Sequence, residues 1–232
     1  NPRKGFYFVG PTEAEPDRLP AGWTQGQADD THWWMPCLES TESRATVEEI
    51  VTAPAGYRVI GNGRLVAKRA NRRAGTVTWR WKQETAHPAY LTSLVVGKYA
   101  EIRDRARSTP LVHYVPRGHE RLGRALFRKT GRMIAVFERV FGHPYPYPKY
   151  AQTIVADFTY GGMENTSATT LFDRLLQMPG DSLDEGYDML VAHELAHQWW
   201  GDLVTCRHWS EGWLNEGFAT YSEIVFREAD AG

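Results

Sequence analysis

The sequence predicts an α+β protein with a β-rich amino-terminal domain over residues 1–105 and a mixed domain over residues 106–232. Up to about residue 105, short runs of β-branched and aromatic residues alternate with Gly, Pro and Asn, and no long helical period appears. After residue 106, apolar residues at helical spacing alternate with strand-like runs. At roughly 100–200 residues per domain, the length allows one or two domains.

Composition and charge exclude several classes of protein. The chain is 42% hydrophobic and 24% charged, as soluble globular proteins are, and its formal net charge is −1. Without a strong field, neither a nucleic acid nor a membrane surface is predicted as a partner. No apolar run approaches the roughly 20 residues that span a bilayer. The two cysteines, Cys37 and Cys206, have no CxxC spacing, so we predict neither a disulfide framework nor a cysteine metal site.

The first residues, "NPRKGFYF", contain neither a starting methionine nor a signal-like stretch. They predict a fragment or a processed product, so a missing targeting signal carries little weight. The compartment stays unknown, with the cytoplasm slightly favoured, and the oligomeric state is not predicted.

In the first domain, strands are predicted at "TVTWRWKQE" (76–84) and within "YLTSLVVGKYAEI" (90–102). Both runs are rich in β-branched and aromatic residues, which favour strands. The intervening "RRAG" (72–75) is predicted to connect a hairpin.

The second domain is predicted to begin with a strand at "LVHYV" (111–115), followed by one helix over 118–141. The helix is predicted from apolar residues at helical spacing, namely Leu122, Leu126, Met133, Phe137 and Val140. A further strand is predicted at "AQTIVADF" (151–158).

Two helices are predicted near the carboxyl end. The first runs from about 183 to 200, with Asp181 or Ser182 as its N-cap and Gly201 as its end. The second begins near Ser210 and continues to the end of the chain.

The first of these helices carries "VAHELAHQWWGDLVT" (191–205). Residues four apart differ by about 40° around a helix and about 6 Å along it, so His193 and His197 share one face and can bind one ion. Neutral imidazole is a good zinc ligand. Glu194 lies about 100° further round, where it can act as general base on a metal-bound water. Alternatively, the two histidines are buried core residues of an ordinary helix.

A third metal ligand is predicted on the second helix. Glu216, in "WSEGWLNEGFATYSE" (209–223), lies nineteen residues after His197, so it can lie opposite the two histidines if the chain turns and the second helix packs back against the first. Two histidines and one glutamate leave the fourth zinc position open, as in catalytic sites. Glu211 is the rival third ligand and ranks lower because "HWSEGW" resembles the approach to a helix.

Metal-bound histidines usually donate their second N–H to a carboxylate or a carbonyl. Glu223 is two turns beyond Glu216 on the same helical face, so we predict that it supports a zinc ligand. A surface glutamate without that role is the alternative.

These motifs resemble those of the M1 family of zinc aminopeptidases. "HELAHQWWGDLVT" followed by "WLNEGFATY" and preceded by "GGMEN" (161–165) occurs in the family's order and spacing, and the resemblance reaches almost the whole chain. It implies a thermolysin-like catalytic domain after the β-rich one, both incomplete, with one Zn²⁺ on His193, His197 and Glu216 and with Glu194 as base. The expected substrates are peptides with free amino termini.

The resemblance also gives "GGMEN" a role. It implies that Glu164 binds the substrate's α-amino group, which needs an anionic partner in a water-excluding cleft. Gly161 and Gly162 would let an extended strand run beside the peptide, and Met163 would help line the pocket for the first residue. Without the resemblance, this segment would be interpreted as a turn with a polar end.

The segment "TQGQA" (24–28) resembles an amino-domain loop of the family that helps to hold the same amino group. It implies substrate-binding roles for Gln25 and Gln27, predicted to lie on the same side of an extended strand. Because both are neutral, amine binding should depend mainly on Glu164.

The resemblance leaves three functions open. The first is an aminopeptidase that hydrolyses the first peptide bond. The second is a bifunctional enzyme that also opens a lipid epoxide, as one family branch does. The third is a zinc-binding fragment or scaffold without activity, since the family's oxyanion-binding tyrosine lies beyond Gly232 and Tyr221 is too close to Glu216 to replace it.

Overall fold

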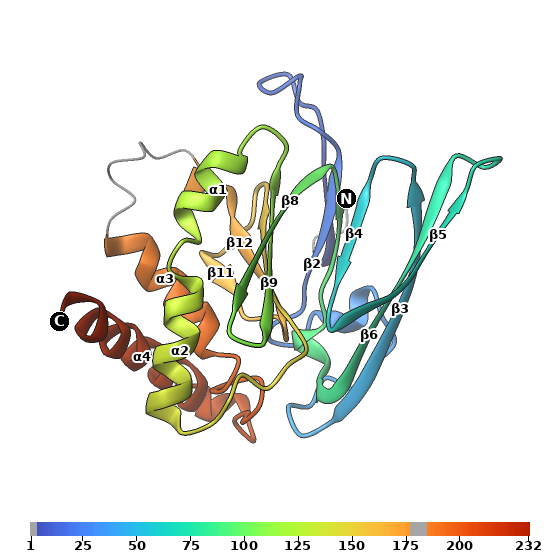
Figure 1. The fold of residues 1–232 in the computed structure, drawn as a ribbon. Coiled ribbons are helices and arrows are strands. Elements are labelled where there is room, and N and C mark those ends of the chain that lie inside the picture. Colours follow the sequence, from blue (N-terminus) through green and yellow to red (C-terminus); the bar gives the residue numbers. More distant parts are fainter. Residues whose placement is uncertain (1–3, 177–184) are drawn as a thin grey trace. The chain divides into compact units, whose positions relative to one another are not determined.

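A computed structural model of the chain describes residues 4–176 and 185–232. It confirms the mixed α+β class and divides into two compact units, Asn1–Tyr99 and Ala100–Gly232 (Figure 1). The division falls a few residues before the boundary predicted at residue 105. Within the described ranges, no helix is both long and apolar enough to cross a membrane, and both cysteines are free thiols.

The first unit is built from two sheets. The four-stranded sheet has the order β1-β2-β7-β4, and the three-stranded sheet has the order β3-β6-β5. The strands are β1 (Gly5–Val9), β2 (Ala21–Gln25), β3 (Arg44–Pro54), β4 (Arg58–Gly61), β5 (Arg64–Asn71), β6 (Thr76–Pro88) and β7 (Leu94–Gly97), with single turns of 3-10 helix at Thr31–Trp33 and Ala89–Leu91.

Tryptophans hold the two sheets of this unit together. Trp79 and Trp81 of β6 pack with Val59 of β4 and Leu94 of β7 in one buried cluster. The indole nitrogen of Trp81 donates to the carbonyl of Val59 at 3.0 Å, so its polar atom is satisfied in the core. The predicted hairpin is confirmed: residues 72–75 join β5 to β6, and Gly75 has a φ of 64°.

His87, at the end of β6, makes the first unit sensitive to acid. Burial lowers the pKa of His87 from 6.5 to about 4, and the charge of Arg44 adds to this effect. Because the carbonyl of Thr85 can only accept, Nδ1 donates to it at 3.3 Å and Nε2 faces the Thr92 hydroxyl at 3.1 Å. The folded unit therefore holds a neutral imidazole.

We expect this histidine to cost the unit about 3 kcal/mol of stability at pH 4. Between the two pKa values the unfolded chain binds the proton and the folded unit does not, so stability is complete above pH 6.5 and falls toward pH 4. Urea unfolding from pH 7 to 4, compared with a His87→Gln variant that cannot titrate, measures the loss. The same pH slope for both chains would contradict the assignment.

The second unit is built on one five-stranded sheet with the order β11-β12-β10-β9-β8. Strand β10 runs parallel to both β9 and β12, and β11 is antiparallel to β12. The strands are β8 (Tyr99–Ala106), β9 (Thr109–Pro116), β10 (Tyr150–Val155), β11 (Gly162–Met163) and β12 (Ala168–Phe172). The predicted strands at 111–115 and 151–158 correspond to β9 and β10.

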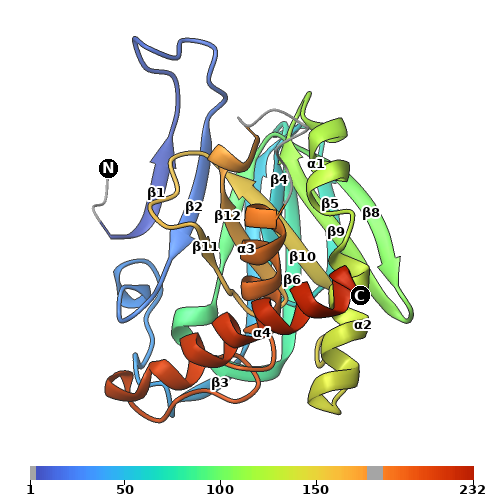
Figure 2. The same ribbon diagram turned by 90° about the vertical axis from the view of Figure 1, so that its left-hand side faces the viewer.

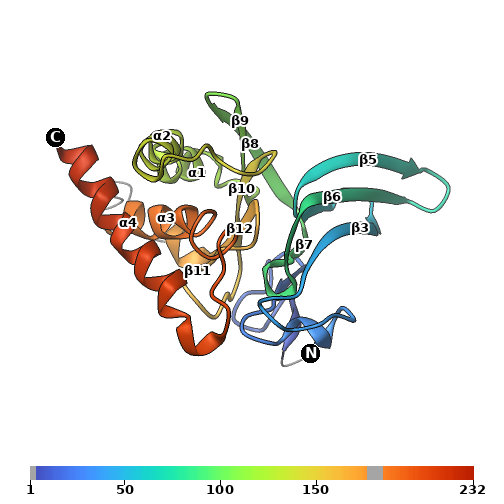
Figure 3. The same ribbon diagram turned by 90° about the horizontal axis from the view of Figure 1, so that it is seen from below.

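Helices cover one face of this sheet, and the last helix forms an outer layer over them (Figure 3). The helices are α1 (Glu120–Leu126), α2 (Thr130–Phe141), α3 (Glu185–Ala196) and α4 (Trp213–Ala231), with single turns of 3-10 helix at Asp173–Leu176 and Trp209–Glu211. The core between the sheet and the helices includes Leu111, Ile154, Phe137, Leu195 and Phe226.

The single helix predicted over 118–141 is wrong, because the chain forms α1 and α2 with a break between them. Around the break, i→i+3 hydrogen bonds replace the α-helical ones, as where the Thr130 amide donates to the Phe127 carbonyl at 3.1 Å. Two tertiary contacts stabilise the break. The ring of Phe127 stacks on that of His113 with centroids 4.6 Å apart, and the Thr130 hydroxyl donates to Oε1 of Gln152. Val140, predicted on the apolar face, is 50% exposed.

The helix predicted to reach residue 200 ends earlier. Helix α3 ends at Ala196, and the next residues form turns in which the Gln198 amide donates to the Leu195 carbonyl at 3.1 Å. Gly201, with a φ of 129°, lies in the following turn and not at the helix end. The predicted N-caps Asp181 and Ser182 lie outside the described residues.

An ion network fixes α4 against α3. Lys129, just before α2, pairs with Asp188 of α3 and with Asp230 of α4. Arg132 adds a second contact to Asp230 at 3.0 Å. Helix α4 is thereby held across α3, and Figure 2 shows it crossing in front of the lower end of that helix.

Candidate metal centre

The two histidines of the HExxH stretch lie at the carboxyl end of α3 and face one another. The amide of His197 still donates to the carbonyl of His193 at 3.2 Å, so the four-residue helical spacing is preserved across the helix end. Their Nε2 atoms are 3.0 Å apart. His197 is buried, at 1% exposure, and His193 is half-buried.

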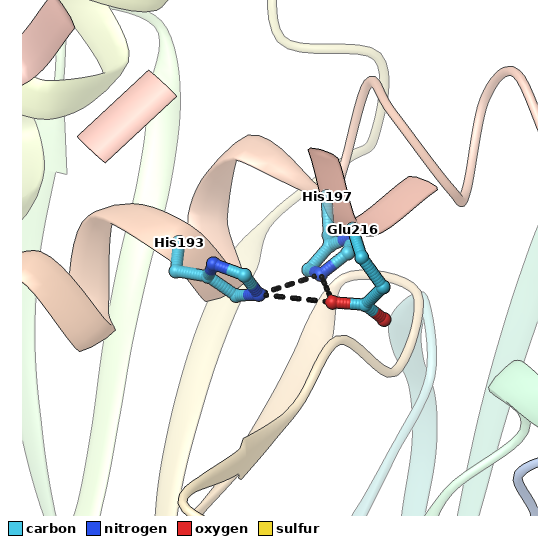
Figure 4. A group of neighbouring side chains, drawn as sticks. All are labelled: His193, His197 and Glu216. Atoms are coloured by element: carbon cyan, nitrogen blue, oxygen red, sulfur yellow. Dashed lines mark hydrogen bonds and ion pairs between the residues drawn. The ribbon is translucent and has the colours of Figure 1, made fainter. Parts of the chain in front are cut away.

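Glu216, in the first turn of α4, closes the group. Its Oε2 lies 3.3 Å from Nε2 of His193 and 3.5 Å from Nε2 of His197 (Figure 4). Across residues 4–176 and 185–232, these three form the one group of potential metal ligands whose donor atoms all lie within 4.8 Å of one another. The rival Glu211 is exposed in the turn before α4 and is not part of it.

The other nitrogen of each imidazole has a partner of its own. Nδ1 of His193 lies 2.7 Å from Oε1 of Glu223, and Nδ1 of His197 donates to the carbonyl of Trp200 at 2.8 Å. These contacts orient the rings so that both Nε2 atoms point at Glu216. Two imidazole nitrogens and one carboxylate oxygen form a donor set that suits zinc, so the residues fit a bound metal.

Glu223 should affect metal affinity although it is not itself a metal ligand, because it contacts the ligand His193. We expect Glu223→Gln to weaken Zn²⁺ binding by about 10–100-fold, since the amide no longer carries the charge that strengthens the His193 imidazole as a ligand. Competition with a chromogenic chelator measures the affinity. Glu228→Gln, an exposed change further along α4, is the matched control. Equal affinity in the two variants would exclude this role.

Glu194 is buried beside the metal group with its charge poorly compensated. The residue is 5% exposed, and within the described part of the chain its Oε2 has no hydrogen-bond partner. Burial raises the pKa of Glu194 well above its usual range; the charge of His193 opposes this, while Glu164 adds to it. A carboxylate with a raised pKa and a free oxygen is suited to exchange protons.

The glycine strand β11 lies directly against this carboxylate. A Cβ atom at Gly162 would lie 2.2 Å from Oε1 of Glu194, so only a residue without a side chain leaves Glu194 where it is. Gly162 also pairs with Leu171 of β12, which fixes the strand. The sequence predicts substrate contact alone for Gly162 and gives no sign of this close approach to Glu194.

Glu164 follows β11 and is the second buried carboxylate of the site. It is 3% exposed, and among the residues described its Oε1 lacks a hydrogen-bond partner. Burial raises the pKa of Glu164. The charges of His197 and His193 oppose this effect, while the charge of Glu216 adds to it. The carboxylate therefore lies within electrostatic range of the metal group.

Met163 follows Gly162 on β11, the outermost strand of the sheet, and Gly161 directly precedes that strand. Gly161 accepts a hydrogen bond from the Phe172 amide at 3.2 Å, and Met163 is 1% exposed. Strand β11 ends the sheet order, so within residues 4–176 and 185–232 one of its edges carries no further strand of this sheet. Its predicted contact with a peptide stays a prediction.

Gln25 and Gln27 lie in the first unit. Gln25 ends β2, is 3% exposed, and its Oε1 accepts from the Gly26 amide at 2.9 Å. Gln27 does not continue the strand as predicted but lies in a turn, because the chain folds back so that the Asp30 amide reaches the Gly26 carbonyl at 2.8 Å. Their predicted role in amine binding stays a prediction.

Gln198 is a residue of this site that the sequence argument missed. It follows His197 directly, is fully buried, and donates through Nε2 to the carbonyl of Glu164 at 2.9 Å. The signal in the sequence is a polar side chain that follows His197 directly within the mainly apolar "LAHQWW". That signal does not reveal the partner, which lies 34 residues away.

The group of His193, His197 and Glu216 is the ligand set that a zinc metallopeptidase requires. Residues 126–231 match the peptidase family M1 domain, and the chain belongs to that family.

Curated relatives agree with this assignment. Aminopeptidase N of Streptomyces lividans is 33% identical over 219 residues, which is 90% of this chain and 25% of the relative. Leucyl aminopeptidase of Saccharolobus solfataricus is 32% identical, with 85% and 25% covered. Aminopeptidase Ey of Gallus gallus is 31% identical, with 95% and 24% covered. The chain thus spans about a quarter of the length of these relatives.

Proposed function

We propose that this chain supplies the metal centre and the amine-binding segment of a zinc-dependent aminopeptidase. The observation that carries the proposal is the convergence of three ligand atoms beside two buried carboxylates, Glu194 and Glu164, each with one oxygen that has no hydrogen-bond partner among the described residues. The names of the relatives, which are aminopeptidases, support the same reaction. The second unit then corresponds to part of a thermolysin-like catalytic domain.

One Zn²⁺ per chain would be held by His193, His197 and Glu216. When bound, it supplies Lewis-acid chemistry, polarising the scissile carbonyl and making water easier to deprotonate. The chain contributes the orientation of the ligands, because Glu223 and the Trp200 carbonyl hold the two imidazoles in place.

Glu194 serves as the general base and then as the general acid. Its carboxylate takes a proton from the attacking water and delivers it to the leaving nitrogen of the peptide. Its burial favours the protonated form between these steps, since a buried charge is costly. Gly162 leaves the space in which this carboxylate lies.

Glu164 binds the α-amino group of the substrate. An ammonium ion that enters the site meets a buried carboxylate with a free oxygen, and a charge-assisted hydrogen bond there is strong. The outer edge of β11 and the preceding Gly161 pair with the backbone of the peptide. Fixing the amino terminus brings the first peptide bond to the reacting groups, which makes the enzyme an exopeptidase.

The amine anchor is tested with Glu164→Gln in a polypeptide of the relatives' length that contains this chain. We expect KM for an aminoacyl-anilide to rise about 30-fold or more, since losing one partner of a buried charge pair costs about 2–5 kcal/mol. Inhibition by an amino acid amide should weaken equally, and inhibition by its N-acetyl derivative should not change. An equal loss for both inhibitors would refute the anchoring role.

A further inference from the structure

Gln198 joins the end of α3, the metal-ligand helix, to the segment that carries Glu164. It follows His197 immediately and has no exposed surface. Its amide nitrogen donates to the carbonyl of Glu164 at 2.9 Å, and its Oε1 accepts from the amide of Ser167 at 2.7 Å. One side chain therefore holds both ends of the four-residue turn from Glu164 to Ser167.

That turn needs external support. Ser167 has a φ of 62°, in the left-handed region that residues with a side chain rarely adopt. Such a conformation persists where its surroundings fix it from several sides. Here the Ser167 carbonyl accepts from Lys149 Nζ at 2.9 Å and from the Ala151 amide at 3.0 Å, while Gln198 holds the Ser167 amide.

Gln198 is itself held in place by a buried tyrosine. The Tyr145 hydroxyl lies 3.2 Å from Oε1 of Gln198 and 3.0 Å from the carbonyl of Lys149, and its single proton serves these two acceptors. Tyr145 is 7% exposed and packs against Trp199 with ring centroids 5.6 Å apart. The glutamine amide is therefore fixed from both ends.

We propose that Gln198 is the positioning residue that sets the distance between the amine-binding carboxylate of Glu164 and the metal-ligand helix. The inference rests on the proposed function, since it takes Glu164 as the group that binds the substrate's amino terminus. Because His197 and Gln198 are consecutive, the same helix end orients the metal group and the backbone of Glu164. The selection of the first peptide bond depends on that distance.

Glutamine has the chemistry that this position requires. Its amide offers a donor, used by the Glu164 carbonyl, and an acceptor, used by Ser167 and Tyr145. Leucine has a similar size and offers neither, while an ionised glutamate accepts but cannot donate. The variants Gln198→Leu and Gln198→Glu therefore separate the two halves of the contact.

The first test measures the turn itself in the 232-residue chain, without any reaction. In Gln198→Leu, the Ser167 amide should exchange its hydrogen at least about tenfold faster, because it loses its acceptor. In Gln198→Glu the exchange should stay close to that of the original chain. The Cys206 amide, which donates to Asn215 at 3.0 Å, is the internal reference.

The second test measures kinetics in a polypeptide of the relatives' length. For an aminoacyl-anilide, Gln198→Leu should raise KM about tenfold while kcat changes less than about threefold, because the contact with the amino group is made equally in the ground state and in the transition state. Zinc content should stay at one per chain. Gln152→Leu is the matched control: this equally buried glutamine accepts from the Thr130 hydroxyl at 3.0 Å.

A raised KM in both Gln198→Leu and Glu164→Gln, with zinc retained and Gln152→Leu unchanged, supports the proposal. A raised KM in Glu164→Gln alone overturns the positioning role and leaves the proposed function intact. An unchanged KM in Glu164→Gln overturns amine binding and the proposal with it. Loss of zinc in Gln198→Leu, or unaltered Ser167 exchange, also overturns the positioning role.

Discussion

Glu194→Gln should abolish hydrolysis while the protein keeps its zinc. The amide has the size of the carboxylate and leaves the packing against Gly162 unchanged, but it cannot accept a proton from water. Because general acid–base catalysis contributes about 10²–10⁴-fold, we expect kcat for an aminoacyl-anilide to fall by about that factor. The measurement combines metal analysis with turnover in a polypeptide of the relatives' length.

A carboxylate outside the site serves as the control for this variant. Glu211→Gln changes an exposed glutamate on the approach to α4, which should leave both zinc content and turnover unaltered. If Glu194→Gln with bound zinc retained turnover within about tenfold of the unmodified protein, Glu194 would not be the base, because a proton acceptor contributes more than that.

Glu216→Ala should greatly lower the affinity for Zn²⁺ while the chain keeps its fold. The Glu216 side chain is 51% exposed, so its removal leaves no cavity in the core. The substitution removes one of the three ligand atoms. Loss of a residue that only supports a ligand lowers metal affinity about 10–100-fold, so we expect a larger fall in Zn²⁺ affinity here. Chelator competition with the 232-residue chain measures this directly.

Two comparisons make the Glu216 result specific. Glu211→Ala removes the rival glutamate and should leave zinc affinity at its original value. Urea unfolding without metal should be nearly the same for Glu216→Ala and the unmodified chain, since Glu216 is half exposed. A zinc affinity that survives in Glu216→Ala and is lost in Glu211→Ala would reverse the ligand assignment.

Periodicity accounts for one part of the site that could be predicted from sequence; Glu216 needed the packing of two helices, and Glu164 needed the family resemblance. His193, His197 and Glu223 each lie at whole-turn helical spacing from a partner residue, so a helix alone brings the right side chains onto one face. The hairpin at 72–75 was equally local, because the turn residues determine it. These features depend on few residues close together in sequence.

The features that sequence patterns missed depend on tertiary contacts. The break between α1 and α2 exists because Phe127 stacks on His113 and Thr130 bonds to Gln152, neither of which is near in sequence. Similarly, α3 ends before the glycine predicted to stop it. Nothing local distinguishes these positions, because apolar spacing continues through the break and the helix end.

The role of Gln198 was hidden for the same reason. Its partners, Glu164 and Ser167, lie more than thirty residues earlier in the chain, and only the packing of α3 beside β11 brings them together. Gly162 shows a related limit, since a glycine in an extended strand is compatible with many close approaches. The role of each residue follows from its spatial neighbours, which are Glu164 and Ser167 for Gln198 and Glu194 for Gly162.

The two imidazoles differ in how evolution or a protein engineer can tune them. The partner of His193 is a side chain, Glu223, so exchanging one residue on α4 can adjust the strength of that ligand. The partner of His197 is the main-chain carbonyl of Trp200, which every amino acid supplies. Substitution of a single residue can thus alter the support of His193, while the support of His197 persists whichever residue occupies position 200.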